Sequence, residues 1–334
     1  MATLKDVAQA AGLNVGTVSR ILNNRGYISE ETRARVYGVM EELHYQPNEL
    51  ARSLSKKKTN TIGLIVPHIV HPYFSAVISS VEQAAYHRKY KLLLCNSNED
   101  SRRELEYIEL CRNNRVDGIL LCSASVDAGL FTGNRLPTVA LERGIGPDCA
   151  SVECDNLLGG TLAARHLIAC GCKHLVHISG LKDTAMPADE REAGFLLECA
   201  RQGVEARAFK TDSSLYYLME YHPFIGAVLR DNPQTDGLFA SSDLIAAQAI
   251  QACRGLGLRT PEDVQIVGFD DVLTASLTAP TLTTIHQPMQ EMAERAVSLL
   301  LAQIEGETVP ARTVLPVHLV QRESTRPITQ EESR

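Results

Sequence analysis

Two groups of polar residues in the sequence could bind a ligand. The first lies in residues 14–20, NVGTVSR, where small and hydroxyl side chains precede an arginine. The second consists of aromatic, charged and hydroxyl residues that follow strand-length apolar runs later in the chain. The sequence has no P-loop, GxSxG or GxGxxG motif, and its histidines do not fall at metal-ligand spacing. We therefore expect a binding protein that has no catalytic residues, metal or cofactor.

The first group lies on the second of two predicted short helices. The first helix begins after Thr3, which has capping-box spacing to Asp6, and Gly12 ends it. The second helix begins after Asn14 and carries an apolar inner face. This face comprises Val18, Ile21 and Leu22. Two short helices joined by a glycine turn match the helix-turn-helix pattern, whose second helix reads base edges in the DNA major groove.

The outer face of this second helix is suited to DNA. It comprises Val15, Gly16, Thr17, Ser19, Arg20 and Asn23. Small side chains allow the helix start to approach base edges, and Arg20 reaches further as a donor that suits guanine. We attribute Gly16 to this closeness, because glycine costs about 1 kcal/mol relative to alanine inside a helix. The alternative is a surface helical hairpin whose Arg20 is only solvated.

The charge distribution agrees with a DNA-binding N-terminal segment. Residues 1–60 hold nine Lys and Arg against six Asp and Glu, whereas residues 61–334 hold 24 against 34. Only the first segment therefore suits a polyanion. The chain contains no apolar run long enough to span a membrane and no leader-like N-terminus, so we expect a cytoplasmic protein. Its nine cysteines are odd in number and lie mostly in apolar runs, which indicates reduced thiols.

A third helix should complete the N-terminal core. It is predicted from a Ser29 cap to Leu43. Its inward residues are expected to be Val36, Val39, Met40 and Leu43. After Pro47, residues 49–55 could form barely two helical turns, which is too short to be stable unless another structure orders them.

From residue 61 onward, strand-length apolar runs alternate with helical stretches. TIGLIVP, KLLLCNS and DGILLCS are such runs, and the alternation begins again beyond residue 155. This pattern predicts parallel strands with crossover helices in two similar α/β halves of roughly 120 residues each. A ligand cleft is expected outside the carboxyl ends of the strands, where the two halves face each other.

Polar residues at the ends of the apolar runs are the candidates for this cleft. The favoured set comprises Tyr73, Phe74, Asp155, Arg191, Ser242 and Asp270. His71, Asp243 and Asp271 adjoin members of this set, although Asp243 could equally cap a helix. An aromatic ring, an arginine and several carboxylates suit a ligand rich in hydroxyl groups.

The N-terminal stretch TLKDVAQAAGLNVGTVSRILNN, followed by ISEETRARV, ELHYQPNELARSL and TIGLIVP, resembles the LacI/GalR family of bacterial transcription regulators, particularly its ribose- and purine-repressor branch. The resemblance covers nearly the whole chain. It implies a three-helix headpiece with a hinge helix, followed by a core of the periplasmic-binding-protein type built from two doubly wound α/β subdomains. The implied domains are residues 1–46 for DNA binding, 47–60 for the hinge and linker, and 61–330 for effector binding and dimerisation. The last divides into 61–155 with 288–314, and 156–287 with 315–330.

The resemblance also implies roles for individual residues. Val15, Gly16 and Arg20 fall at the family's base-reading positions, with Thr17, Ser19 and Asn23 nearby for phosphate or base-edge contacts. Leu54 falls at the hinge leucine that wedges into a minor-groove step. The remaining positions that match DNA contacts are Thr3, Tyr45, Ala51 and Lys56. The contexts RxxGF and GFDD assign effector contact to Arg191 and Asp270.

The combined prediction is a homodimeric transcriptional regulator, expected to be a repressor of carbohydrate-utilisation genes. A palindromic operator is its DNA partner, and a small sugar, with a pentose such as ribose favoured, controls operator affinity from the cleft. One alternative is a global catabolite regulator whose corepressor is a phosphorylated carrier protein. Two others are a sugar-processing enzyme with a vestigial DNA-binding segment and a binding protein without DNA function.

Overall fold

The computed structural model describes residues 2–23, 25–46, 58–122, 136–143, 149–181, 188–211, 215 and 218–328. The chain divides into two compact units, Met1–Thr59 and Asn60–Arg334. Among the described residues, no helix combines the length and the apolar character needed to cross a bilayer. All nine cysteines are buried, and none is joined to another in a disulfide.

Three helices form the first unit, with bounds α1 (Leu4–Ala10), α2 (Val15–Leu22) and α3 (Glu30–Glu42). The predicted caps are present: Thr3 forms a capping box with Asp6, and Asn14 and Ser29 cap the next two helices. Gly12, between α1 and α2, has a φ of 67°, a left-handed conformation that glycine adopts at little cost. This turn lets two short helices fold back on each other.

Apolar residues from all three helices form the core of this unit. Its buried members are Val7, Ala8, Ala11, Val18, Ile21 and Val36. Val39 and Met40 are partly buried against them, but Leu43 is 37% exposed and the prediction that it faces inward was wrong. Because α3 ends at Glu42, Leu43 is the cap residue and no longer continues the inner face of the helix.

The second unit contains two six-stranded sheets, each the centre of one lobe. The first lobe has the strand order β11-β5-β4-β3-β1-β2, and the second has the order β12-β10-β9-β8-β6-β7. The strands of the first lobe are β1 (Thr61–Val66), β2 (Lys91–Asn96), β3 (Gly118–Leu121), β4 (Thr138–Leu141), β5 (Ala150–Cys154) and β11 (Arg312–Leu315). Those of the second are β6 (His174–Leu181), β7 (Glu205–Thr211), β8 (Gly237–Ala240), β9 (Gln265–Asp270), β10 (Thr283–His286) and β12 (His318–Val320).

All strand pairs are parallel except the pair of β10 and β12, which is antiparallel. The buried runs predicted from the sequence, such as GILL in β3 and QIVGFD in β9, account for this arrangement because parallel strands are covered on both faces. The doubly wound α/β architecture expected for the core is therefore confirmed.

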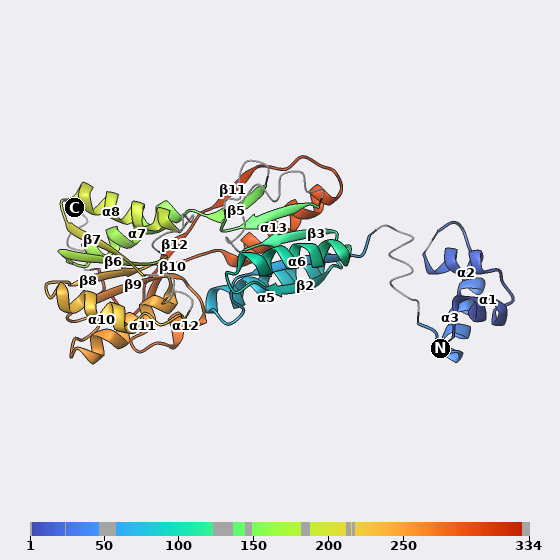
Figure 1. Cartoon of the computed structure of the whole chain (residues 1–334), viewed down its shortest axis with the longest axis horizontal. Coiled ribbons are helices and arrows are strands. Elements are labelled where there is room, and N and C mark those ends of the chain that lie inside the picture. The colour runs from blue at the N-terminus through green and yellow to red at the C-terminus, as the bar shows by residue number, and fades with distance from the viewer. Residues whose placement is uncertain are drawn as a thin grey trace. The chain divides into compact units, whose positions relative to one another are not determined.

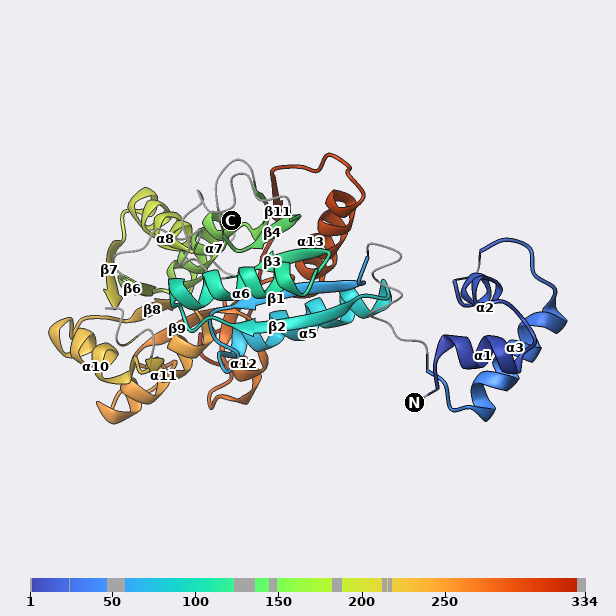
Figure 2. The ribbon, with the colours of Figure 1, turned by 45° about the vertical axis from the view of Figure 1, so that its right-hand side comes forward.

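Helices cover both faces of each sheet. In the first lobe, α5 (Pro72–His87) packs with α13 (Met289–Ile304), and α6 (Ser101–Asn113) lies in front of β1 in Figure 2. In the second lobe, α7 (Asn156–Ala169) and α8 (Asp189–Gln202) cover one face, whereas α10 (His222–Asp231) and α11 (Asp243–Gly255) cover the other (Figure 1). The short helix α12 (Leu273–Leu277) contacts α11.

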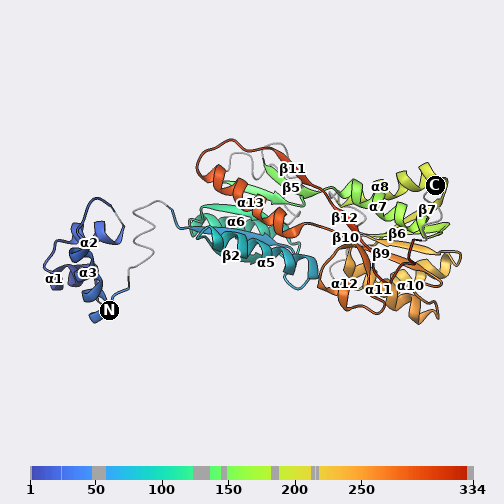
Figure 3. The ribbon, with the colours of Figure 1, turned by 180° about the vertical axis from the view of Figure 1, so that it is seen from behind.

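The chain passes between the lobes at three places. These are the links from β5 to α7, from β10 to α13 and from β11 to β12. Figure 3 shows the β10 and β12 segments running together at the junction, where His286 is paired with His318. Because each lobe is assembled from separate stretches of sequence, a movement of one lobe relative to the other must bend these links.

Candidate functional site

The outer face of α2 carries the residues predicted to bind DNA. Arg20 is exposed and Val15 is 39% exposed, so both are available to a partner. The Thr17 hydroxyl donates to the Asn14 side chain at 3.0 Å, and Asn23 Nδ2 donates to the Ser19 carbonyl oxygen at 2.9 Å. These local bonds fix the polar side chains on the helix that presents Arg20.

The structure of the headpiece also explains why residue 16 is a glycine. A Cβ at this position would lie 3.3 Å from Asn14 Oδ1, the atom that accepts the hydrogen bond from Thr17 N at 2.7 Å. A methyl group would therefore press on the N-cap that starts α2. Glycine at residue 16 leaves room both for the cap and for a partner surface.

The other predicted DNA-binding residues have different surroundings. Thr3 is engaged in its capping box, where its hydroxyl donates to Asp6 Oδ2 at 2.8 Å. Tyr45 is half-buried and packs against the headpiece core. Ala51, Leu54 and Lys56 lie outside the described residues.

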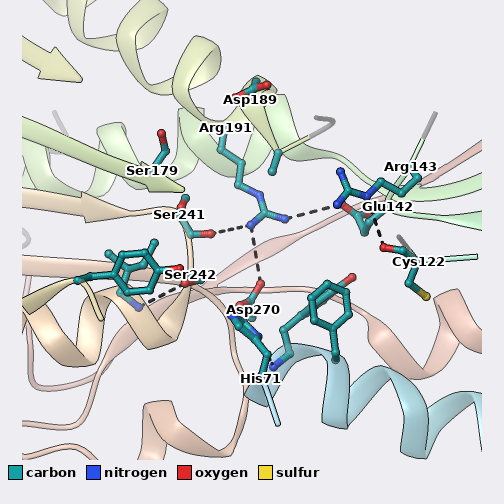
Figure 4. Close-up of a pocket in the computed structure, with 15 residues that line it drawn as sticks. His71, Cys122, Glu142, Arg143, Ser179, Asp189, Arg191, Ser241, Ser242 and Asp270 are labelled. Carbon is teal, nitrogen blue, oxygen red and sulfur yellow. Dashed lines mark hydrogen bonds and ion pairs between the residues drawn. The ribbon is translucent and has the colours of Figure 1, made fainter. Parts of the chain in front are cut away.

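A cavity of about 110 Å³ lies between the two lobes (Figure 4). Its walls come from the carboxyl ends of strands in both lobes and from the helices that follow them. The lining residues are His71, Tyr73, Phe74, Cys122, Glu142, Arg143, Ser179, Ala188, Asp189, Arg191, Tyr221, Ser241, Ser242, Ile245 and Asp270. This is the place where the sequence predicts a ligand cleft.

Arg191, in the first turn of α8, is the central polar residue of the cavity. Its Nε donates to Asn156 Oδ1 at 2.7 Å and its Nη1 donates to the Ser241 carbonyl oxygen at 2.6 Å. The guanidinium carbon lies 3.6 Å from the centre of the Phe269 ring. Nη2 approaches Glu142 at 3.7 Å and Nη1 approaches Asp270 at 3.8 Å, so the arginine joins carboxylates from the two lobes (Figure 4).

Asp270 ends β9 and is 3% exposed. Its φ of 112° lies in the left-handed region, a strained conformation for a residue with a side chain. Oδ1 accepts a hydrogen bond from Gln287 Nε2 at 2.8 Å, and Gln287 itself lies on the link from β10 to α13. Burial raises the pKa of Asp270 to about 7, which Arg191 partly offsets.

Glu142, which sequence reasoning missed, is the first-lobe partner of Arg191. It follows β4, and its carboxylate accepts hydrogen bonds from Cys154 N and from Asn156 Nδ2, the latter at 3.1 Å. Burial raises its pKa, against the opposing influence of Arg191. The available signal was the charged residue that ends the apolar run PTVALE, the same signal that identified Asp270 at the end of VGFD.

The predicted effector residues are not all in the cleft. Tyr73, Phe74 and Ser242 line it together with Arg191 and Asp270. The structure places Asp155 outside the lining set, because its carboxylate caps α7 by accepting a hydrogen bond from Leu158 N at 2.9 Å. The next residue, Asn156, is fully buried and bridges Arg191 and Glu142 instead.

Asp243 and Asp271 also serve the fold rather than the cavity. Asp243 accepts hydrogen bonds from the backbone N of Val272 and from the Thr284 hydroxyl, whereas the cap of α11 is Ser242. Asp271 accepts from Arg322 Nη2 at 2.6 Å and lies 2.9 Å from His286 Nδ1. Both carboxylates thereby stabilise the backbone that presents Asp270.

Two buried polar atoms of lining residues have no hydrogen-bond partner within the part of the chain that the structure describes. These are Ser179 Oγ in the second lobe and Arg143 Nη1 in the first. Buried polar atoms are rarely left without a partner, so both are suited to a bound polar molecule. His71, which also lines the cavity, is neutral near pH 7, because burial lowers its pKa to about 4.

Comparison with known proteins relates both units to one family. Residues 3–48 match the family model described as bacterial regulatory proteins, lacI family, and residues 164–325 match a periplasmic binding protein-like domain. The ribose operon repressor of Halalkalibacterium halodurans is 36% identical, with 98% of each chain covered. The sucrose operon repressor of Streptococcus mutans is 34% identical over 97% of this chain and 99% of its own.

A solved structure resembles the body of the chain. It is a periplasmic binding protein/LacI transcriptional regulator from Alkaliphilus metalliredigens complexed with D-xylulofuranose. It is 31% identical, with a TM-score of 0.73, and the match covers 80% of this chain and 100% of that one. With relatives above 30% identity along nearly the whole sequence, the chain belongs to the LacI family of bacterial regulatory proteins.

Proposed function

We propose that the cleft binds a small, neutral sugar and that this binding controls the affinity of the headpiece for operator DNA. The observation that carries the proposal is Arg191, which contacts Glu142 from the first lobe and Asp270 from the second. A ligand that competes for or adds to these contacts changes the free energy of lobe closure. The named relatives, which are ribose and sucrose operon repressors, support a carbohydrate ligand.

The size of the cavity favours a monosaccharide. A single buried water needs about 10–15 Å³, so a cavity of about 110 Å³ has room for a small organic molecule. A free pentose has about ten non-hydrogen atoms, whereas a disaccharide has more than twice as many. The relative bound to D-xylulofuranose supports a ligand of the smaller size.

The charge of the lining disfavours a phosphorylated sugar. The positive charges of Arg143 and Arg191 are accompanied by the carboxylates of Glu142, Asp189 and Asp270. An incoming phosphate would therefore meet three acidic side chains and only two guanidinium groups, and like charges at short range repel. Neutral hydroxyl groups instead accept from the arginines and donate to the carboxylates.

The DNA-binding part of the proposal rests on α2. Arg20 is assigned to a base edge, with Val15 and Gly16 in close approach to the groove. Contacts to phosphates, sugars or neighbouring bases are assigned to Thr3, Thr17, Ser19, Asn23 and Tyr45, and to Ala51, Leu54 and Lys56, which are predicted from the sequence alone. Leu54 is assigned to the minor-groove wedge.

A homodimer is the proposed active species. Two short segments expose large apolar side chains: Ile69 and Val70 in the first lobe, and Leu273 and Leu277 in α12 of the second. Val70, Leu273 and Leu277 are each more than 70% exposed, which favours a covering partner for both lobes. A two-fold dimer presents two headpieces, and the operator is therefore proposed to be palindromic.

Ligand binding and DNA binding test the proposal together. A thermal-shift screen of free pentoses, hexoses and their phosphates should raise the melting temperature with a neutral monosaccharide and leave it unchanged with the matching phosphate. The operator affinity of the dimer should then change in the presence of that sugar. A phosphate ester that binds more tightly than the free sugar would contradict the proposed ligand class, and turnover of the sugar would reveal an enzyme.

A further inference from the structure

Helices α7 and α8 approach each other backbone to backbone at two glycines. A Cβ at Gly160 would overlap the Arg191 carbonyl oxygen and lie 2.8 Å from the carbonyl carbon of that residue. A Cβ at Gly194 would overlap the Leu157 carbonyl oxygen and lie 3.0 Å from its carbonyl carbon. Real Cβ atoms do not approach backbone atoms this closely, so neither position accepts a side chain without a shift of one helix.

A third glycine leaves room for the ring beneath the arginine. A Cβ at Gly159 would overlap one edge of the Phe269 ring and lie 3.0 Å from Cζ. This is the ring on which the Arg191 guanidinium stacks, 3.6 Å from its centre. Gly159 therefore determines how closely the Phe269 ring approaches α7, and Gly160 determines how closely the backbone of Arg191 does.

We infer that the pair Gly159–Gly160, opposed by Gly194, positions Arg191 for effector binding. Two adjacent glycines disfavour a helix, since glycine is the poorest helix former after proline, so local stability does not explain their place in α7. The absence of side chains at Gly160 and Gly194 lets the first two turns of α7 and α8 pack together, where Asn156 accepts the hydrogen bond from Arg191 Nε. The inference rests on the proposed function of the cleft.

The contacts of Arg191 are sensitive to a small displacement. Its hydrogen bonds to Asn156 and Ser241 are 2.7 and 2.6 Å long, and both ion contacts already lie between 3.7 and 3.8 Å. A helix shift of about 1 Å, which the new methyl group would require, is enough to lose correctly oriented contacts. Gly160→Ala should therefore weaken the binding of the neutral sugar by about tenfold or more.

A double-mutant cycle separates positioning from general destabilisation. Sugar affinity is measured by calorimetry on the full-length chain and on the variants Gly160→Ala, Arg191→Lys and both together. If Gly160 acts through Arg191, the double variant should bind no more weakly than Arg191→Lys alone. Equal affinity of Gly160→Ala and the parent chain, or fold-losses that multiply in the double variant, would overturn the inference.

Gly237→Ala is the matched control. A Cβ there would overlap Leu175 and lie 3.0 Å from Cys172 Sγ, but Gly237 begins β8, at the end of the sheet opposite the cleft. This variant should lose thermal stability and keep its sugar affinity within about twofold. A similar loss of affinity in Gly237→Ala and Gly160→Ala would assign the effect to stability alone.

A variant that displaces only a side chain covers the case in which Gly160→Ala does not fold. Gly159→Ala meets the Phe269 ring and no backbone atom among its nearest neighbours, and it should also weaken sugar binding. Unchanged affinity in a folded Gly159→Ala would overturn the inference. If the parent chain binds no neutral sugar, the proposed function fails; if it binds one and only Arg191→Lys weakens the complex, the positioning role alone fails.

Discussion

Asp270 should make sugar binding depend on pH in the neutral range. Burial raises the pKa of this carboxyl to about 7, so a substantial fraction is protonated in the unliganded protein near neutrality. In the proposed complex, the ionised carboxylate accepts hydrogen bonds from sugar hydroxyls. Affinity should therefore be greatest above pH 8 and fall as the pH drops through the pKa of the unliganded state.

The size of the pH dependence follows from the single proton that Asp270 must release before the sugar binds. With a pKa of about 7, the dissociation constant should be nearly constant above pH 8 and rise about tenfold for each pH unit well below 7. Between pH 8 and pH 5.5 the total change is about 30-fold, or about 2 kcal/mol. His71 does not contribute over this window, because burial lowers its pKa to about 4.

Calorimetry at half-unit pH steps, in buffers of different ionisation enthalpy, measures both the affinity and the proton release. Asp270→Asn should bind weakly with little pH dependence. Glu142→Gln controls for the second carboxylate, whose pKa burial also raises, and should retain the dependence. A pH-independent parent protein, or the same dependence in Asp270→Asn, would refute the reasoning.

Three further predictions concern the arginines and the headpiece. Arg191→Lys should weaken sugar binding by about 10- to 100-fold, since charged hydrogen bonds are worth about 1.5–3 kcal/mol. DNA binding without the sugar should stay intact. Calorimetry measures the sugar affinity and a DNA titration the operator affinity, and an unchanged sugar affinity would remove Arg191 from the site. Arg20→Ala should cost about 1–3 kcal/mol of discrimination between operator and mismatched duplex, by competition binding, and undiminished sequence preference would reassign this residue. Asn14→Ala should lower headpiece stability by about 1 kcal/mol in chemical denaturation; a larger stability in the variant would contradict the role of the cap.

Much of the architecture was predictable because local signals and periodicity agreed. Thr3, Asn14 and Ser29 are hydroxyl or amide residues placed directly before apolar helical repeats, and all three cap helices. Fully apolar runs such as GILL identified buried parallel strands. Leu43 was misassigned because the apolar spacing continues one residue beyond the end of α3.

The site was only partly predictable because a polar residue at a strand end has several uses. At the turn after β5, Asp155 caps α7 whereas Asn156 contacts Arg191. Whether Asp155 or Asn156 caps the helix depends on the residue at which α7 begins, and sequence patterns locate helix boundaries poorly. Glu142 could not be paired with Arg191 from the sequence, since their contact arises where the two lobes face each other. Gln287 could not be paired with Asp270 either, since their contact depends on which strand lies beside β9, namely β10.

If sugar binding in the cleft and DNA binding by the headpiece are coupled, one titration reveals it. An operator duplex selected from a random palindromic pool is titrated with the full-length protein at fixed salt, with and without a saturating neutral sugar, and fluorescence anisotropy reports the affinity. The proposed coupling predicts that the sugar changes the operator dissociation constant by about tenfold or more in the parent chain and by a smaller factor in Arg191→Lys at the same sugar concentration. An identical operator affinity with and without bound sugar in the parent chain would contradict it.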